Sequence, residues 1–464
     1  MPTPINPPPI YQNPFMAPNG FSGIHLNAYM TDTGAVEGPA SAPNQSVQQK
    51  VIPAPGIAAT IAFNAKGQIV TIHIGSPDTP EGAPTIMLID PTTLNTLDSV
   101  RLPQRKKNTS GKISFAGGYF YLDQNSNVVC VTANQKLQIY STDNDQLALG
   151  QTYDLQSFIH NSSDILNSVL PDSLGNIWYI TQQGTIGYVD TTGKPSVEEH
   201  LNEPISKSFA SDGNGRVYVV TDSPNPGVVN GALYCYRASA NKPTRVWRTS
   251  YTCGNPPAKS GQNQVGSGTT PTCFDDFKNN QFVAIADNSP QMNVNVYRRD
   301  NGKLVVQQPV FEAWPDANSC ENSLIAMNRS IIVENNFGNT DIKSTAGTKT
   351  TTPGVNRVDF DPDTKSSKVV WHNDTIAVPS VVSQLSTGDG MIYTYAKDST
   401  GWFWAALDFE TGDLVQCSDY VKFTDAGAPE EEASNNYYAG LTVGPDGAAY
   451  LSVFGGLTVW RKAS

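Results

Sequence analysis

Short apolar runs, rich in Val, Ile and Tyr, recur along the chain directly after tight turns that contain glycine or asparagine. Runs of this length and composition are typical of β-strands. The turns lie at residues 65–68, 116–118, 173–176, 213–216, 278–281, 327–330, 387–390 and 445–447. The strands that we expect after them are 69–74, 119–122, 177–181, 217–221, 282–286, 331–333, 391–395 and 449–453.

A second marker recurs within most of these units, where an apolar run ends in aspartate and a turn with Thr or Gly follows. These aspartates are Asp90, Asp190, Asp300, Asp361 and Asp408. Aspartate at the first turn position can accept a hydrogen bond from the backbone two residues on, which favours a hairpin. Each unit is therefore expected to contain four antiparallel strands, the content of one propeller blade.

Eight such units predict an all-β fold, a single β-propeller of eight four-stranded blades, with seven blades as the alternative if one unit is an insertion. The last unit ends after the apolar run 457–460 and lacks a fourth strand. Residues 50–52 are expected to supply that strand and to close the ring. The proline-rich segment 1–49 is predicted to be an irregular arm, and residues 50–464 to form the propeller domain.

This blade rhythm resembles the eight-bladed quinoprotein-like propellers, the superfamily of pyrroloquinoline-quinone dehydrogenases, over most of residues 50–464. The resemblance is one of architecture, because the chain has no adjacent Cys-Cys pair and no evident tryptophan-centred docking repeats. It implies quinone-dependent dehydrogenation as one possible function.

Composition narrows the function classes. The 464 residues carry a formal net charge of −12, which argues against a nucleic-acid partner because such partners need clustered Lys and Arg. No apolar run is long enough to cross a bilayer, so no membrane partner is expected. We expect a soluble protein, cytoplasmic or secreted after removal of a signal peptide not present in this chain. None of the six cysteines forms a CxxC pair, so no zinc site is predicted.

Candidate chemistry gathers in residues 265–338, where strand-like runs end in carboxylates and carboxamides. In a propeller, the loops that lead into innermost strands and the loops after second strands share one face around the channel. Glu321 belongs to the first kind of loop, and Asp287 and Glu334 to the second. The arm carries His25 and is long enough to reach them. These four residues are the predicted catalytic groups of a pocket at the channel mouth.

Polar neighbours are expected to bind and orient a substrate there. They are Asn27, Tyr29, Thr269, Thr270, Asn288, Asn322, Asn335 and Lys397. Carboxylates held in different environments act as general acid and base, and imidazole transfers protons near neutral pH. The same oxygens could bind a divalent cation such as calcium, or could simply cap strand ends.

The pattern therefore favours an enzyme that uses acid–base chemistry on a small polar or sugar-like molecule: a lyase, a hydrolase or an isomerase. One alternative is a non-catalytic propeller that binds a protein or glycan partner. The quinone-dependent dehydrogenase implied by the resemblance is the other alternative.

Overall fold

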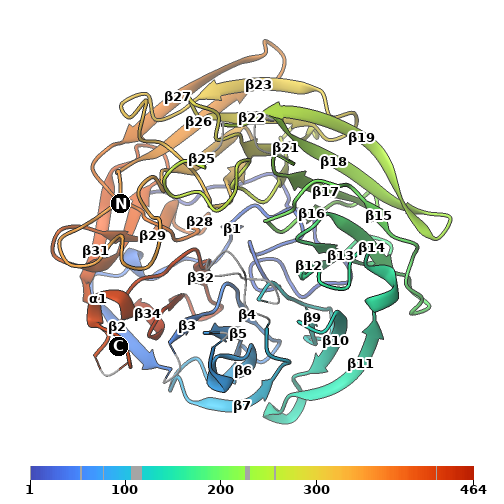
Figure 1. The fold of residues 1–464 in the computed structure, drawn as a ribbon. Helices are drawn as coiled ribbons and strands as arrows, with labels where there is room; N and C mark the ends of the chain where they lie inside the picture. The colour runs from blue at the N-terminus through green and yellow to red at the C-terminus, as the bar shows by residue number, and fades with distance from the viewer. Residues whose placement is uncertain are drawn as a thin grey trace.

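The computed structural model describes residues 2–52, 55–76, 78–105, 118–224, 230–254, 258–424 and 426–463. In this part of the chain, eight sheets form a closed ring around a central axis (Figure 1). Helix is limited there to α1 (Glu430–Ala433) and four short 3-10 turns. The predicted all-β propeller of eight blades is confirmed.

The blades follow one another in chain order, each running from the axis outward. Blade 1 contains β3 (Gly56–Ile57), β4 (Ile61–Phe63), β5 (Ile69–Gly75), β6 (Thr85–Ile89) and β7 (Thr96–Arg101). Blade 2 contains β8 (Tyr121–Leu122), β9 (Val128–Val131), β10 (Lys136–Ser141) and β11 (Ala148–Asp154). Blades 3 and 4 contain β12 (Leu166–Pro171), β13 (Ile177–Thr181), β14 (Thr185–Val189) and β15 (Glu199–His200), then β16 (Ala210–Ser211), β17 (Arg216–Thr221), β18 (Asn230–Ser239) and β19 (Lys242–Thr252).

The second half of the ring repeats this order. Blades 5 and 6 contain β20 (Thr272–Asp275), β21 (Gln281–Ala286), β22 (Asn293–Arg298) and β23 (Leu304–Pro309), then β24 (Ile325–Met327), β25 (Ser330–Glu334), β26 (Val355–Asp361) and β27 (Ser366–Asn373). Blade 7 contains β28 (Gln384–Ser386), β29 (Met391–Lys397), β30 (Trp402–Asp408) and β31 (Leu414–Val421). Blade 8 contains β32 (Thr442–Val443), β33 (Ala449–Val453), β34 (Gly456–Lys462) and β2 (Gln45–Val51).

Seven of the eight predicted turns connect the first and second strands of a blade, and the aspartate turns connect the third and fourth. Blade 2 differs from the prediction. Residues 116 and 117 of its predicted turn lie outside the described residues, and the run after them forms β8, the innermost strand rather than the second. The β8–β9 turn is built instead by Asp123, whose Oδ1 accepts the N–H groups of Asn125 and Asn127.

The ring closes between the two ends of the chain. Strand β2 pairs antiparallel with β34, from Gln45 opposite Lys462 to Val51 opposite Gly456. The predicted closure by residues near 50 is confirmed, and the closing strand begins at Gln45, five positions before residue 50. Backbone pairing along this seven-residue strand covers the edge that blade 8 would otherwise expose.

The segment before β2 runs through the middle of the ring (Figure 1). Its backbone carbonyls accept hydrogen bonds from N–H groups on or beside the innermost strands of six blades. The donor–acceptor pairs are Phe63–Phe21, Leu122–Ser22, Ser211–Ala28, Cys273–Tyr29, Ala326–Thr31 and Leu385–Asp32. Strand β1 (Thr33–Gly34) then adds to β28 in parallel. The arm is thus an ordered lining of the channel, fixed by main-chain bonds that any residue type can make.

Large aromatic side chains fill the space between neighbouring blades. In blades 7 and 8, Trp404 and Trp460 are fully buried with their ring centroids 6.2 Å apart. Burying apolar area of this size is the main stabilising contribution between blades, at about 25 cal/mol per Å². Among the described residues, none forms a helix long and apolar enough to span a membrane.

Candidate functional site

Four side chains from alternate blades approach one another on the axis. Tyr119, Lys207, Glu321 and Tyr437 lie in the loops that lead into the innermost strands of blades 2, 4, 6 and 8. Lys207 Nζ donates a hydrogen bond to Glu321 Oε2 and forms an ion pair with it, and Asn263 Nδ2 donates to the same oxygen at 3.2 Å. We call these four residues the axial cluster.

Burial shapes the electrostatics of the axial cluster. Desolvation alone would lower the pKa of Lys207, but the ion pair and hydrogen bond with Glu321, with Asp222 and Tyr119 nearby, outweigh it and raise that pKa. Burial raises the pKa of Asp222 to about 7, although Lys207 and Ser206 act in the opposite direction. Burial also raises the pKa of Tyr437 to about 12. A carboxyl that titrates near neutral pH therefore accompanies the buried ion pair.

A second group of side chains lies between the arm and blades 6 and 7. The arm contributes His25 and Asp32, while blade 6 contributes Ser323, before β24, and Glu334, the last residue of β25. His25 Nδ1 is 2.9 Å from Asp32 Oδ2, and His25 Nε2 is 3.0 Å from Ser323 Oγ. We call these four residues the inner cluster.

Glu334 is an acid of the inner cluster whose pKa is strongly raised. Burial raises its pKa to about 8, and the charge of Asp32 acts in the same direction. Hydrogen bonds from Ser383 and from Asn322 Nδ2, the latter 2.7 Å from Oε2, offset part of this effect. Burial also raises the pKa of Asp32, whereas His25 lowers it. At neutral pH Glu334 is thus mostly protonated, beside a His–Asp pair.

Residual exposure separates the side chains that solvent reaches from those that are only packed. As whole residues, His25, Ser323 and Lys207 retain 7–9% exposure, whereas the side chain of Glu321 retains only 1%. Five predicted binding or catalytic residues retain none: Asn27, Thr269, Asp287, Asn288 and Asn335. His25, Ser323 and Lys207 are therefore the partly accessible residues of the two clusters.

The fully buried residues have structural partners instead. The Asp287 carboxylate accepts hydrogen bonds from Ser289, Asn293, Asn295 and Gln307, all within its own blade. Asn288 donates to the Gly266 and Cys320 carbonyls, and Asn335 Oδ1 accepts from the Ser319 N–H. The Thr269 hydroxyl accepts from the Ala286 N–H. Asp287 was expected to line the pocket, but its hydrogen bonds are directed into blade 5.

The other predicted binding residues divide in the same way. Thr270 and Asn322 reach the inner cluster, since the Thr270 N–H donates to Ser323 Oγ at 3.1 Å and Asn322 binds Glu334. Tyr29 Oη donates to Asp275 at 3.1 Å, and Asn27 Oδ1 accepts from the Tyr29 N–H. Lys397 Nζ donates to the Gly347 carbonyl at 2.9 Å, away from both clusters.

The sequence pattern places Lys207 in a loop at the channel mouth, but Lys207, Ser323 and Asp32 were not among the predicted site residues. Lys207 had a usable signal, because it precedes an innermost strand as Glu321 does. Ser323 lies two positions after Glu321 in the same loop, so its nearness to a predicted site residue was its signal. Asp32 gave no signal, since its approach to His25 depends on the path of an irregular arm.

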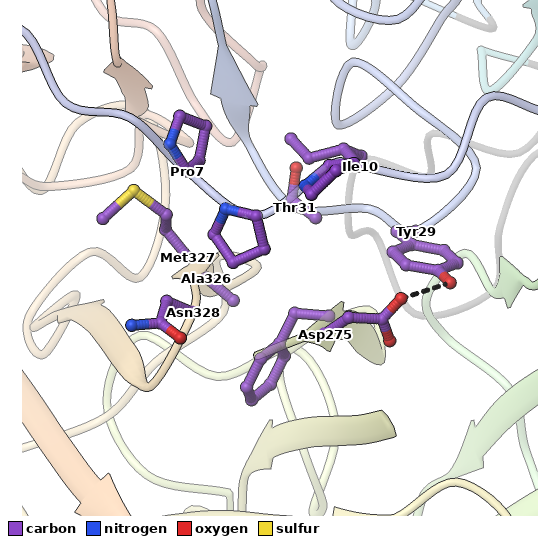
Figure 2. A pocket seen from close by; sticks show the side chains of 11 residues that line it. Pro7, Ile10, Tyr29, Thr31, Asp275, Ala326, Met327 and Asn328 are labelled. Carbon is purple, nitrogen blue, oxygen red and sulfur yellow. Dashed lines mark hydrogen bonds between the residues drawn. The ribbon is translucent and has the colours of Figure 1, made fainter. Parts of the chain in front are cut away.

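A pocket lies on the other side of the arm, between Pro7–Ile10 and blades 5 and 6 (Figure 2). Tyr29 and Asp275 border it, joined by their hydrogen bond, and Met327 and Asn328 lie opposite. Its volume of about 10 Å³ is room for roughly one water molecule. The prolines of the arm therefore cover this end of the channel, and the pocket is too small for an organic substrate.

The quinone that the architecture implies can be tested against these residues. Pyrroloquinoline quinone is a planar polycarboxylate, so its site must supply cations for its carboxylates. In and beside the two clusters, the described side chains include the acids Asp222, Glu321 and Glu334, and the cation Lys207 is already paired with Glu321. These residues do not fit the quinone. In the described ranges, no group of three His, Cys, Asp or Glu is placed to hold a metal ion.

Comparison with known sequences yields no matching family model. A protein from Archaeoglobus fulgidus, described as uncharacterized, is 22% identical over 497 aligned positions. The alignment covers 98% of this chain and 91% of that protein. The similarity extends along the whole propeller, but it indicates no function, because that protein is itself described as uncharacterized.

Solved structures share the architecture at low sequence identity. Quinohemoprotein alcohol dehydrogenases from Pseudomonas putida and Comamonas testosteroni align with TM-scores of 0.59 and 0.57, each at 10% identity. These alignments cover 96% and 95% of this chain, and 81% and 80% of those chains. Chaetomium thermophilum Sqt1, bound to the N-terminus of a ribosomal protein, aligns with a TM-score of 0.53 at 10% identity, over 93% of this chain and 100% of its own. The chain thus has the eight-bladed fold of the pyrroloquinoline-quinone dehydrogenase-type propellers.

Proposed function

We propose that the protein is an enzyme that performs acid–base chemistry on a small polar or sugar-like molecule, bound at the axial end of the channel. The observation that carries this proposal is the inner cluster, where protonated Glu334 lies beside the His25–Asp32 pair. A protonated acid beside a hydrogen-bonded histidine offers a proton donor and a proton acceptor, which general acid and general base catalysis require.

Each residue has a distinct role in this proposal. Asp32 accepts the Nδ1–H of His25, so His25 Nε2 carries the lone pair and acts as the base. Glu334 supplies a proton. The Lys207–Glu321 pair above them offers a cation and carboxylate oxygens, which suit the hydroxyl groups of a sugar-like molecule.

Binding can be tested without knowing the reaction. We expect at least one member of a panel of monosaccharides, sugar acids and polyols to raise the melting temperature. A ligand at one hundred times its dissociation constant stabilises a protein by about 2.7 kcal/mol. The double variant Lys207→Gln/Glu321→Gln removes both charges together, so it leaves no unpaired buried charge, and it should lose the rise.

The matched control is Lys278→Gln/Asp363→Asn, which removes an exposed ion pair with its charges 2.8 Å apart. This variant should keep the full ligand response. A response that persists in the axial double variant contradicts the proposal, as does a panel in which no compound changes the melting temperature of the unaltered protein.

A further inference from the structure

Ser323, His25 and Asp32 are linked in series by the hydrogen bonds of the inner cluster. Ser323 Oγ lies 3.0 Å from His25 Nε2, and His25 Nδ1 lies 2.9 Å and 3.1 Å from the two Asp32 carboxylate oxygens. A nucleophile, a base and a group that orients the base form this series in serine hydrolases of unrelated fold. We propose that Ser323 is a covalent nucleophile and that the protein hydrolyses carboxylic esters of small hydroxyl-rich molecules.

The backbone of the arm is arranged to bring His25 and Asp32 together. His25 and Asp32 have φ values of 56° and 49°, and Leu26 and Met30 between them have 71° and 61°. Left-handed backbone at a residue other than glycine costs roughly 1 kcal/mol or more. Four such residues within eight positions make this the most strained part of the arm. Strain of this kind is concentrated at functional sites, where the surrounding structure holds it in place.

If Ser323, His25 and Asp32 had a purely structural role, their hydrogen bonds would serve to hold the arm against the ring. The arm is already fastened by main-chain bonds, including Ala28 O with Ser211 N at 2.8 Å and Thr31 O with Ala326 N at 3.1 Å. These bonds would form whatever side chain occupied position 25. Ser323 also retains 8% exposure and His25 7%, whereas the packed residue Thr269 on the neighbouring blade retains none.

The inner cluster lies next to the axial cluster. Glu321 and Ser323 are two positions apart in the loop that leads into β24, with a bend at Asn322 between them. Glu321 reaches Lys207, and Ser323 reaches His25. A polyhydroxylated group held by the Lys207–Glu321 pair would therefore place an attached ester at the depth of Ser323. This step rests on the proposed function, which assigns binding to that pair.

The reaction balances with water as the second reactant. Ser323 Oγ attacks the ester carbonyl carbon while its proton passes to His25 Nε2, and the electron pair of the C=O bond moves to the carbonyl oxygen, which becomes an oxyanion. The carbonyl re-forms as the bond to the alcohol oxygen breaks, and His25 returns the proton to that oxygen. Water then attacks the acyl-serine with His25 again as base, which releases the carboxylic acid and regenerates Ser323.

A small organophosphorus fluoride, diisopropyl fluorophosphate, is a direct probe because it forms a stable phosphoester with an activated serine. We expect mass spectrometry of the full-length protein to find the adduct on Ser323. Ser323→Ala should abolish the adduct, and Ser319→Ala, a change in the same loop outside both clusters, should not. His25→Asn should slow labelling by about 100-fold or more, the usual contribution of a general base.

Hydrolysis of p-nitrophenyl acetate supplies the second readout. We expect an initial burst of one p-nitrophenolate per protein, absent in Ser323→Ala. The melting temperature of each variant, measured in parallel, shows whether that variant folds. If a variant does not fold, the burst and the Ser323 adduct of the unaltered protein test the inference instead. Absence of an adduct on Ser323, or labelling that His25→Asn does not slow, overturns this inference. Sugar binding lost only in the axial double variant would still support the proposed function.

Discussion

The replacement Glu334→Gln tests the electrostatics of the inner cluster without assuming any activity. In the folded protein burial raises the pKa of Glu334 from 4.5 to about 8. Between these two pH values the unfolded chain has released the proton and the folded protein has kept it. Stability therefore falls as pH rises from 4.5 and stops falling near pH 8. Glutamine keeps the shape of the protonated acid and cannot ionise, so the variant should not show this loss.

The size of the effect follows from the same pKa. Each pH unit in the window corresponds to about 1.4 kcal/mol, so the loss at pH 7 is about 3 kcal/mol. For a chain of 464 residues the unfolding entropy is about 1 kcal/mol per degree, so the melting temperature changes by about 1 °C for each kcal/mol. Relative to the unaltered protein, Glu334→Gln should melt at a similar temperature at pH 5 and about 3 °C higher at pH 7.

Scanning calorimetry from pH 5 to pH 8 measures this difference directly. Glu312→Gln, a change at an exposed glutamate, is the control for general charge effects and should follow the unaltered protein. Comparing two proteins at each pH cancels the contributions of other acids such as Asp222, whose pKa is also raised. A difference that stays constant with pH, or that changes sign, would show that Glu334 is ionised in the folded protein.

Two further predictions concern the fold. Gly456 has a φ of 147°, and a Cβ added there would lie 1.9 Å from the Lys50 carbonyl oxygen of β2; we expect Gly456→Ala to weaken ring closure by roughly 2 kcal/mol or more, measured as a lower melting temperature. Gly20→Ala, which also has positive φ but open space around its Cβ, should cost less, and equal losses would contradict the steric argument. Burial lowers the pKa of His73 from 6.5 to about 4, so stability should decline as pH falls through that interval, and His73→Leu should reduce the decline in calorimetry. An unchanged decline would assign the acid sensitivity to other groups.

The blade pattern could be predicted because local chemistry encodes it. Asp90 and Asp190 form their turns by accepting N–H groups two residues on, an interaction that needs no distant partner. Blade 2 was misassigned because the glycine pair 117–118 has the composition of a turn but precedes β8, whereas the turn after β8 begins at Asp123. The closing strand was found because the last unit lacked a partner, a deficit that the sequence itself displays.

The site was less predictable because a position in a blade does not fix the direction of a side chain. Asp287 and Glu334 are equivalent in their blades, yet Asp287 binds within its own loop and Glu334 reaches Asn322. The shorter side chain and the Ser289 and Asn293 that follow Asp287 explain this difference.

The arm connects ring closure with assembly of the inner cluster. Strand β2 closes blade 8 only about a dozen residues after Asp32, and the segment between them is anchored to blade 7 through β1. The main-chain bonds that position His25 require the innermost strands of several blades to be in place first. The arm contributes His25 and Asp32 to the inner cluster, and blade 6 contributes Ser323 and Glu334. The cluster therefore forms only when the arm is in place in the closed ring. A change that opens blade 8, such as Gly456→Ala, should therefore slow labelling of Ser323 although it touches no group of the cluster.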